Sequence, residues 1–166
     1  AWYSGNKDII EAIINEGDGL SGENRVLALI YAASRNKIDL LDTLLKKKFD
    51  PNAKYKAPAK IFAANFRCAA ADIINKMDDR GRHTEISVTP LIAAIVEGNL
   101  PAVKKLIAAG ARTDIGRGRN APLLVSIGFS RYEITRFLLE SGADINATGP
   151  CGETPLIYAV YLDDYP

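Results

Sequence analysis

The middle of the chain alternates short apolar stretches with polar breaks, a pattern typical of paired helices. An apolar run begins at Leu91 and stops at Gly98, and a second apolar stretch follows directly. In that second stretch Val103, Leu106 and Ile107 recur at the three- and four-residue spacing that places side chains on one face of a helix. The pattern therefore predicts a first helix over residues 91–97 and a second over 101–109.

The residues at the ends of these stretches are suited to starting and ending helices. Thr89 and Pro90 stand at the start of the first helix, where Thr is a good N-cap and Pro costs no hydrogen bond. Gly98 and Gly110 stand after the two predicted helices, where a glycine readily takes the left-handed conformation that ends a helix. The caps and the apolar spacing thus agree on the same pair of helices.

This pair of helices is repeated along the chain. Thr89-Pro90-Leu91 returns as Ala121-Pro122-Leu123 and as Thr154-Pro155-Leu156, and Gly110-Ala111 returns as Gly142-Ala143. Both markers have a period of about 32 residues, and a fixed period of 20–50 residues is the signature of a repeat architecture. In such an array we expect burial between repeats for Leu106, Ile107, Leu138 and Leu139.

The loop and helix-start motifs also resemble a known family. Gly142-Ala143-Asp144-Ile145-Asn146, followed by Thr154-Pro155-Leu156, is similar to the ankyrin repeat signature. The resemblance implies an all-α solenoid of stacked helical pairs with projecting β-hairpin loops. It also implies a single domain over 1–166 with five to six repeats, both terminal ones incomplete, in a chain that belongs to a longer protein. The expected repeats are 1–19, 20–53, 54–82, 83–114, 115–147 and 148–166.

Composition and charge narrow the function classes. Apolar residues make up 48% of the chain and charged residues 25%, which is ordinary for a globular protein. The formal net charge of +1 argues against nucleic acid as the partner. No apolar run approaches the ~20 residues that span a bilayer, so we expect no membrane association. With only two cysteines, Cys68 and Cys151, we expect an intracellular location, cytoplasmic or nuclear.

The sequence predicts no catalytic, metal or cofactor site. His83 is the only histidine, and two distant cysteines cannot complete a metal site with it. Cys68 falls at a helix turn, where a small half-buried residue is common, so a nucleophilic Cys–His pair is disfavoured. Gly116-Arg117-Gly118-Arg119 follows no predicted strand and is interpreted as a repeat loop, not a phosphate loop. We therefore expect no enzyme activity and no small-molecule substrate.

The resemblance places a binding surface on the ends of the first helices and on the loops. Phe129, Tyr161 and Tyr3 are aromatic residues at these positions, and aromatic and Arg residues are frequent in binding hot spots. Several loops carry basic residues, which favours either solvated loop tips or a partner with an acidic surface. The partner-binding residues expected from this reasoning are Phe129, Tyr161, Glu97, Asn65, Arg35, Tyr3, Lys56, Arg82, Arg117, Arg119 and Asn120.

We expect a protein–protein interaction module, a scaffold or adaptor. The alternative is a substrate-recruiting or regulatory arm of a larger multidomain enzyme or of a bacterial effector secreted into a host cell. The resemblance also implies a modification: Asn146, preceded by Asp144-Ile145 and by Leu138, matches ankyrin asparagines that an oxygenase hydroxylates. A structural role in holding the loop is the competing interpretation of Asn146.

Overall fold

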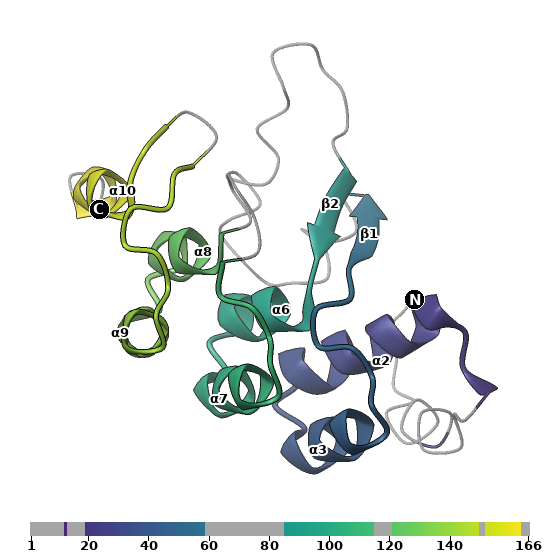
Figure 1. Cartoon of the computed structure of the whole chain (residues 1–166). Helices are drawn as coiled ribbons and strands as arrows, with labels where there is room; N and C mark the ends of the chain where they lie inside the picture. Colours follow the sequence, from purple (N-terminus) through teal and green to yellow (C-terminus); the bar gives the residue numbers. More distant parts are fainter. Residues whose placement is uncertain (1–11, 13–18, 59–84, 115–120, 150–151, 164–166) are drawn as a thin grey trace.

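The computed structural model describes residues 12, 19–58, 85–114, 121–149 and 152–163 as two layers of helices (Figure 1). One layer holds the first helix of each pair: α2 (Gly22–Ser34), α6 (Pro90–Glu97), α8 (Pro122–Gly128) and α10 (Pro155–Asp163). The other layer holds the second helices: α3 (Ile38–Lys46), α7 (Leu100–Ala108) and α9 (Tyr132–Glu140). The strands are β1 (Tyr55–Pro58) and β2 (Glu85–Val88). The predicted all-α stack of helical pairs is confirmed.

The helices begin where the capping residues predicted. The backbone N–H of Ile92 donates to Thr89 Oγ1 at 3.2 Å, with Pro90 in the first turn of α6. The N–H of Ile157 makes the same bond to Thr154 Oγ1 at 3.4 Å. Ala121 has no side chain that could cap α8. Helices α6 and α7 each begin one residue earlier than expected, a shift that is common at helix ends.

The helices end at two positions per repeat that have a left-handed backbone. Gly98, Gly110 and Gly142 have φ angles of 78°, 88° and 84°. Counted in the repeat register, Asn36 and Ser130 correspond to Gly98, and Lys48 corresponds to Gly110 and Gly142; these three have φ angles of 53°, 52° and 60°. A residue with a Cβ is strained in this region, so the turns at Asn36, Lys48 and Ser130 carry backbone strain.

This strain predicts that Lys48→Gly stabilises the protein. Lys48 is exposed and has a φ of 60°, and glycine adopts that conformation without a steric penalty. We expect the free energy of unfolding to rise by about 0.5–1 kcal/mol. Urea unfolding followed by circular dichroism measures it. Lys46→Gly, in the last turn of α3, is the control and should lower the stability by about 0.5–1 kcal/mol.

The core lies between the two layers and between neighbouring pairs. Leu44, Leu106 and Leu138 occupy the same position of α3, α7 and α9, and all three are fully buried. Two further residues were expected to be buried. Ile107 is half-buried, and Leu139 is 39% exposed. The prediction for Leu139 was wrong because this position, one residue further along the helix, lies at the edge of the apolar face.

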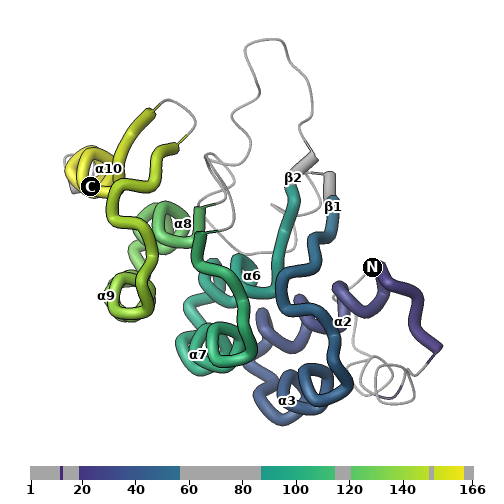
Figure 2. The backbone as a smooth tube through the Cα atoms, viewed as in Figure 1, coloured from purple at the N-terminus to yellow at the C-terminus, as the bar shows by residue number. Residues whose placement is uncertain are grey.

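The order of stacking differs from the order of the predicted repeats. Helix α2 packs directly on α6, and Lys105 of α7 pairs with Asp42 of α3 at 2.6 Å. Strand β1 is antiparallel to β2, with Tyr55 opposite Val88 and Pro58 opposite Glu85 (Figures 1 and 2). The second and fourth predicted repeats are therefore neighbours in the stack.

A repeat over 54–82 was expected between those two neighbours. The pairing of β1 with β2 places Pro58 opposite Glu85, so the two ends of the segment between them lie side by side. Residues 59–84 lie outside the described residues. The division of the chain into five to six repeats stays a prediction.

Candidate functional site

Two charged residues occupy the same position at the ends of neighbouring first helices. Arg35 is the C-cap of α2 and Glu97 is the last residue of α6, and both are exposed. Both were expected to bind a partner. Because α2 and α6 pack side by side, these ends lie next to each other on one face of the stack.

A third charged residue, Arg131, joins this face from the next unit. Its guanidinium donates to the carbonyl of Val96 from Nη2 at 2.6 Å and from Nε at 3.2 Å, and it lies against Gly98. A cation at this place also faces the negative end of the α6 dipole. Sequence reasoning missed Arg131. The sequence held one signal that could have identified it: Arg131 occupies the same repeat position as Asn99, at the start of a second helix.

The three residues form what we call the Arg35–Glu97–Arg131 row. Partial burial raises the pKa of the Glu97 carboxyl above its ordinary value, and the charges of Arg35 and Arg131 act in the opposite direction. The Glu97 carboxyl therefore lies within the electrostatic influence of two cations from the neighbouring units. Removal of water from Glu97 outweighs their attraction, so the ionised form is disfavoured in the folded protein.

This balance predicts how Glu97→Gln changes the dependence of stability on pH. The folded state binds the Glu97 proton more readily than the unfolded chain, so the native protein loses stability as pH rises above about 4, the unfolded value. Because the side chain is exposed, the effect is small. We expect Glu97→Gln to match the native protein at low pH and to be slightly more stable at neutral pH.

Thermal unfolding of both proteins between pH 4 and 7 tests this expectation. Glu133→Gln, on the exposed side of α9, is the control for removing one negative charge. A native protein that gains stability over Glu97→Gln as pH rises would show that the cations dominate instead.

Phe129, the aromatic residue expected in the binding surface, is less exposed than predicted. Phe129 is the C-cap of α8, and its ring is half-buried against the core. Tyr161 of α10 is 60% exposed. Tyr161 is therefore the more accessible of the two aromatic residues, because Phe129 uses much of its surface to pack within the stack.

The remaining expected binding residues divide between described and undescribed parts of the chain. Lys56 is exposed on β1. The structure thus supports accessible positions for Arg35, Glu97, Lys56 and Tyr161. The other six lie outside the described residues: Tyr3, Asn65, Arg82, Arg117, Arg119 and Asn120.

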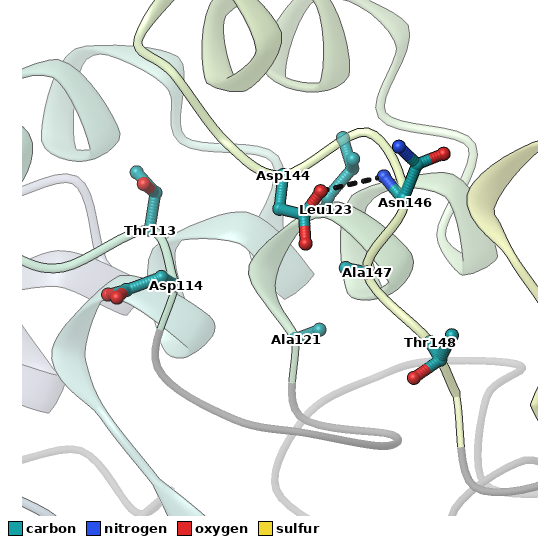
Figure 3. Close-up of a pocket in the computed structure, with 8 residues that line it drawn as sticks. All are labelled: Thr113, Asp114, Ala121, Leu123, Asp144, Asn146, Ala147 and Thr148. Carbon is teal, nitrogen blue, oxygen red and sulfur yellow. Dashed lines mark hydrogen bonds between the residues drawn. The ribbon is translucent and has the colours of Figure 1, made fainter.

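A small pocket lies between two successive loops (Figure 3). Its volume is about 250 Å³, and its lining includes Asp114, Asp144 and Asn146 above the buried Leu123. Asp114 is paired with Arg112 at 2.9 Å, and Asp144 Oδ1 accepts the N–H of Asn146 at 2.9 Å. Ligand pockets usually measure about 300–1,000 Å³, so the volume of this one lies just below the usual range.

Asn146 lies in this loop, where both interpretations of its role can be compared. The residue is exposed, and its N–H is held by Asp144 in the same turn that Asn52 forms with Asp50 at 2.8 Å. This geometry supports the interpretation that Asn146 has a structural role in its loop. Hydroxylation of Asn146 stays a prediction.

The described residues hold neither a membrane-spanning helix nor a cluster of metal ligands. None of their helices combines the length and apolarity needed to cross a membrane. No group of three or more His, Cys, Asp or Glu side chains within 12, 19–58, 85–114, 121–149 and 152–163 could hold a metal ion. Cys68, His83 and Cys151 lie outside these ranges.

Comparison with known families agrees with the stacked helical pairs. A family model described as ankyrin repeats (3 copies) matches residues 61–149, more than half of the chain. Ankyrin repeats are generally protein–protein interaction modules and are typically not enzymes. The helix caps, the left-handed turns and the two-layer stack are the structural counterparts of this match. The chain therefore belongs to the ankyrin repeat family.

Proposed function

We propose that the chain is a scaffold or adaptor that binds a protein partner through the ends of its first helices and the adjoining loops. The observation that carries the proposal is the Arg35–Glu97–Arg131 row. It extends across three stacked units on one face, and two of its members were expected from the sequence to bind. Tyr161 lies near the end of α10, in the unit that follows that of Arg131.

The energetics of Glu97 support a binding role. Partial burial raises the pKa of the Glu97 carboxyl, so ionisation of this group is slightly less favourable in the folded protein than in the unfolded chain. Groups that are kept at some cost to stability are concentrated at functional sites. A partner cation could pair with the exposed Glu97 carboxylate, while a partner carboxylate could form a charge-assisted pair with Arg35.

The chemistry of the partner surface follows from the charges around the row. Arg35 and Arg131 contribute positive charge to this side, and Glu97 lies between them in the stack. The basic residues predicted in the undescribed loops, among them Arg117 and Arg119, would strengthen the positive character. We propose a partner with a mainly acidic surface that presents at least one basic side chain to Glu97. A protein with this role is proposed to work inside cells.

The proposal predicts which charge deletions weaken binding. Once cross-linking and mass spectrometry have identified a partner, its Kd is measured for Arg35→Ala and for Glu97→Ala. Each is expected to weaken binding about tenfold or more, as for a residue near the centre of an interface. The matched controls are Arg136→Ala and Glu140→Ala, an exposed Arg–Glu pair on α9 whose loss should change Kd by less than about threefold.

Circular dichroism establishes that all four variants are folded before binding is compared. Stronger losses for the α9 pair than for the α2 and α6 pair would place the interface on the second helices and reject the proposal. The role as the arm of a larger enzyme or of a bacterial effector stays a prediction, because nothing in the described parts of the chain tests it.

A further inference from the structure

The loops that follow α3 and α7 are joined by one asparagine side chain. Asn52 Nδ2 donates to the carbonyl of Gly110 at 2.9 Å, and Asn52 Oδ1 accepts the N–H of Arg112 at 2.8 Å. A side-chain amide can make both bonds because it has a donor and an acceptor. The two loops are therefore in direct contact through Asn52.

The next pair of loops, after α7 and after α9, has an aspartate in place of this asparagine. Counted in the repeat register, Asp114 corresponds to Asn52. An ionised carboxylate cannot donate to a carbonyl. Asp114 instead accepts from Arg112 Nε at 2.9 Å and from Arg112 Nη2 at 3.0 Å. Among the described residues, no hydrogen bond joins the loop after α7 to the loop after α9.

The pocket of about 250 Å³ lies between these two unjoined loops (Figure 3). Figure 3 shows the Asp114 carboxylate turned away from Asp144, which agrees with its pairing to Arg112. The substitution of an aspartate for the bridging asparagine thus coincides with an open space at the equivalent place in the stack.

The lining of this pocket combines a free negative charge with polar and apolar groups. Asp144 is exposed and accepts the N–H of Asn146 at 2.9 Å, and no cation within the described ranges pairs with it. Thr113 and Thr148 add hydroxyl groups, and Leu123 adds an apolar surface. Such a lining suits a side chain that carries a positive charge on an apolar stem.

We propose that this pocket receives an arginine side chain of a protein ligand, with Asp144 as its carboxylate partner. A guanidinium is always charged and presents several donors in one plane, so it can pair with Asp144 and also donate to the threonine hydroxyls. A lysine ammonium is more strongly hydrated and lacks this fork of donors, so it fits the pocket less well. The inference rests on the proposed function in one respect, that the arginine belongs to a protein partner.

A small probe tests the pocket without that partner. N-acetyl-arginine N-methylamide is titrated into the ¹⁵N-labelled protein, and the chemical shifts of the backbone amides are followed. We expect saturable shifts centred on Asp144, Asn146 and Thr148. The citrulline analogue has a similar shape without the charge and should bind about tenfold more weakly, because the charge-assisted pair is lost. The lysine analogue should also bind more weakly than the arginine probe.

Two substitutions and a matched control assign the binding to this carboxylate. Asp144→Asn keeps an acceptor for the N–H of Asn146 but removes the charge, and it should weaken probe binding about tenfold. Asp114→Asn restores the donor that Asn52 supplies, so a new bridge should close the pocket and weaken binding to a similar degree. Asp50→Asn is the control, because Asp50 makes the same turn with Asn52 in another loop; it should change binding by less than about twofold.

Several results would overturn the proposal. They are shifts that do not saturate, equal binding of the arginine and citrulline probes, equal binding of the arginine and lysine probes, or equal losses for Asp50→Asn and Asp144→Asn. Arg35→Ala and Glu97→Ala should leave probe binding unchanged, since neither residue lines the pocket. A failure of the Arg35–Glu97–Arg131 row to bind a partner is therefore distinguishable from a failure of this pocket to bind arginine.

Discussion

Leu138→Ala is expected to lower the free energy of unfolding by about 2–5 kcal/mol, the range for removing a buried leucine side chain. Leu138 is fully buried in α9, and its equivalents Leu44 and Leu106 are buried in α3 and α7. The truncation leaves a cavity on the buried face of α9, the helix that packs on α8. Urea unfolding followed by circular dichroism measures the loss.

The adjacent Leu139 is the matched control because it has the same side chain on the same helix. It is 39% exposed, so Leu139→Ala should cost less than about 1.5 kcal/mol. A loss for Leu139→Ala equal to that for Leu138→Ala would mean that the core does not follow the helix face seen here. In that case the register of α9 would have to be reconsidered.

The features that the sequence predicted well are those determined within a few residues. Thr89 and Pro90 start α6 because their own side chains satisfy or remove the first backbone donors. Gly98 and Gly110 end helices because they relieve local strain. Such choices need no knowledge of neighbouring repeats, so the two-layer helical pairs could be inferred from one sequence.

The stacking order could not be predicted from the repeat spacing alone. It depends on the pairing of β1 with β2, two strands that lie far apart in the chain. The same limit hid the left-handed positions at Asn36 and Ser130, which carry no glycine marker. In both cases the structure depends on contacts or strain outside the local motif.

The exposure of the candidate binding residues was predictable for some of them but not for all. Register correctly placed Arg35 and Glu97 at exposed helix ends. It did not show that Phe129 packs partly against the core or that Arg131 reaches back to Val96. Side-chain reach between units depends on which residues face each other, and a periodic pattern contains no information on that.

Asn99→Asp is expected to destabilise the protein more than Asn99→Ala does. The amide of Asn99 donates to the carbonyls of Ala33 at 2.9 Å and Ser34 at 2.8 Å, and so joins α7 to the end of α2. Asn99→Ala removes both donors from partly buried carbonyls and should cost about 1–3 kcal/mol. An ionised carboxylate cannot donate, and it also faces the negative end of the α2 dipole, which adds to the loss.

The pH dependence separates the charge effect from the lost hydrogen bonds. The carbonyls raise the pKa of the introduced carboxyl in the folded state, so the folded protein takes up its proton more readily than the unfolded chain. The extra cost of Asn99→Asp over Asn99→Ala should therefore be largest at neutral pH and should shrink as pH falls toward about 4. Asn52→Ala is the reference for an exposed bridge between units and should cost only about 0.5–1.5 kcal/mol. If Asn99→Asp and Asn99→Ala lose the same stability at every pH, the carbonyls of α2 are reached by water, and Asn99 does not join the two units.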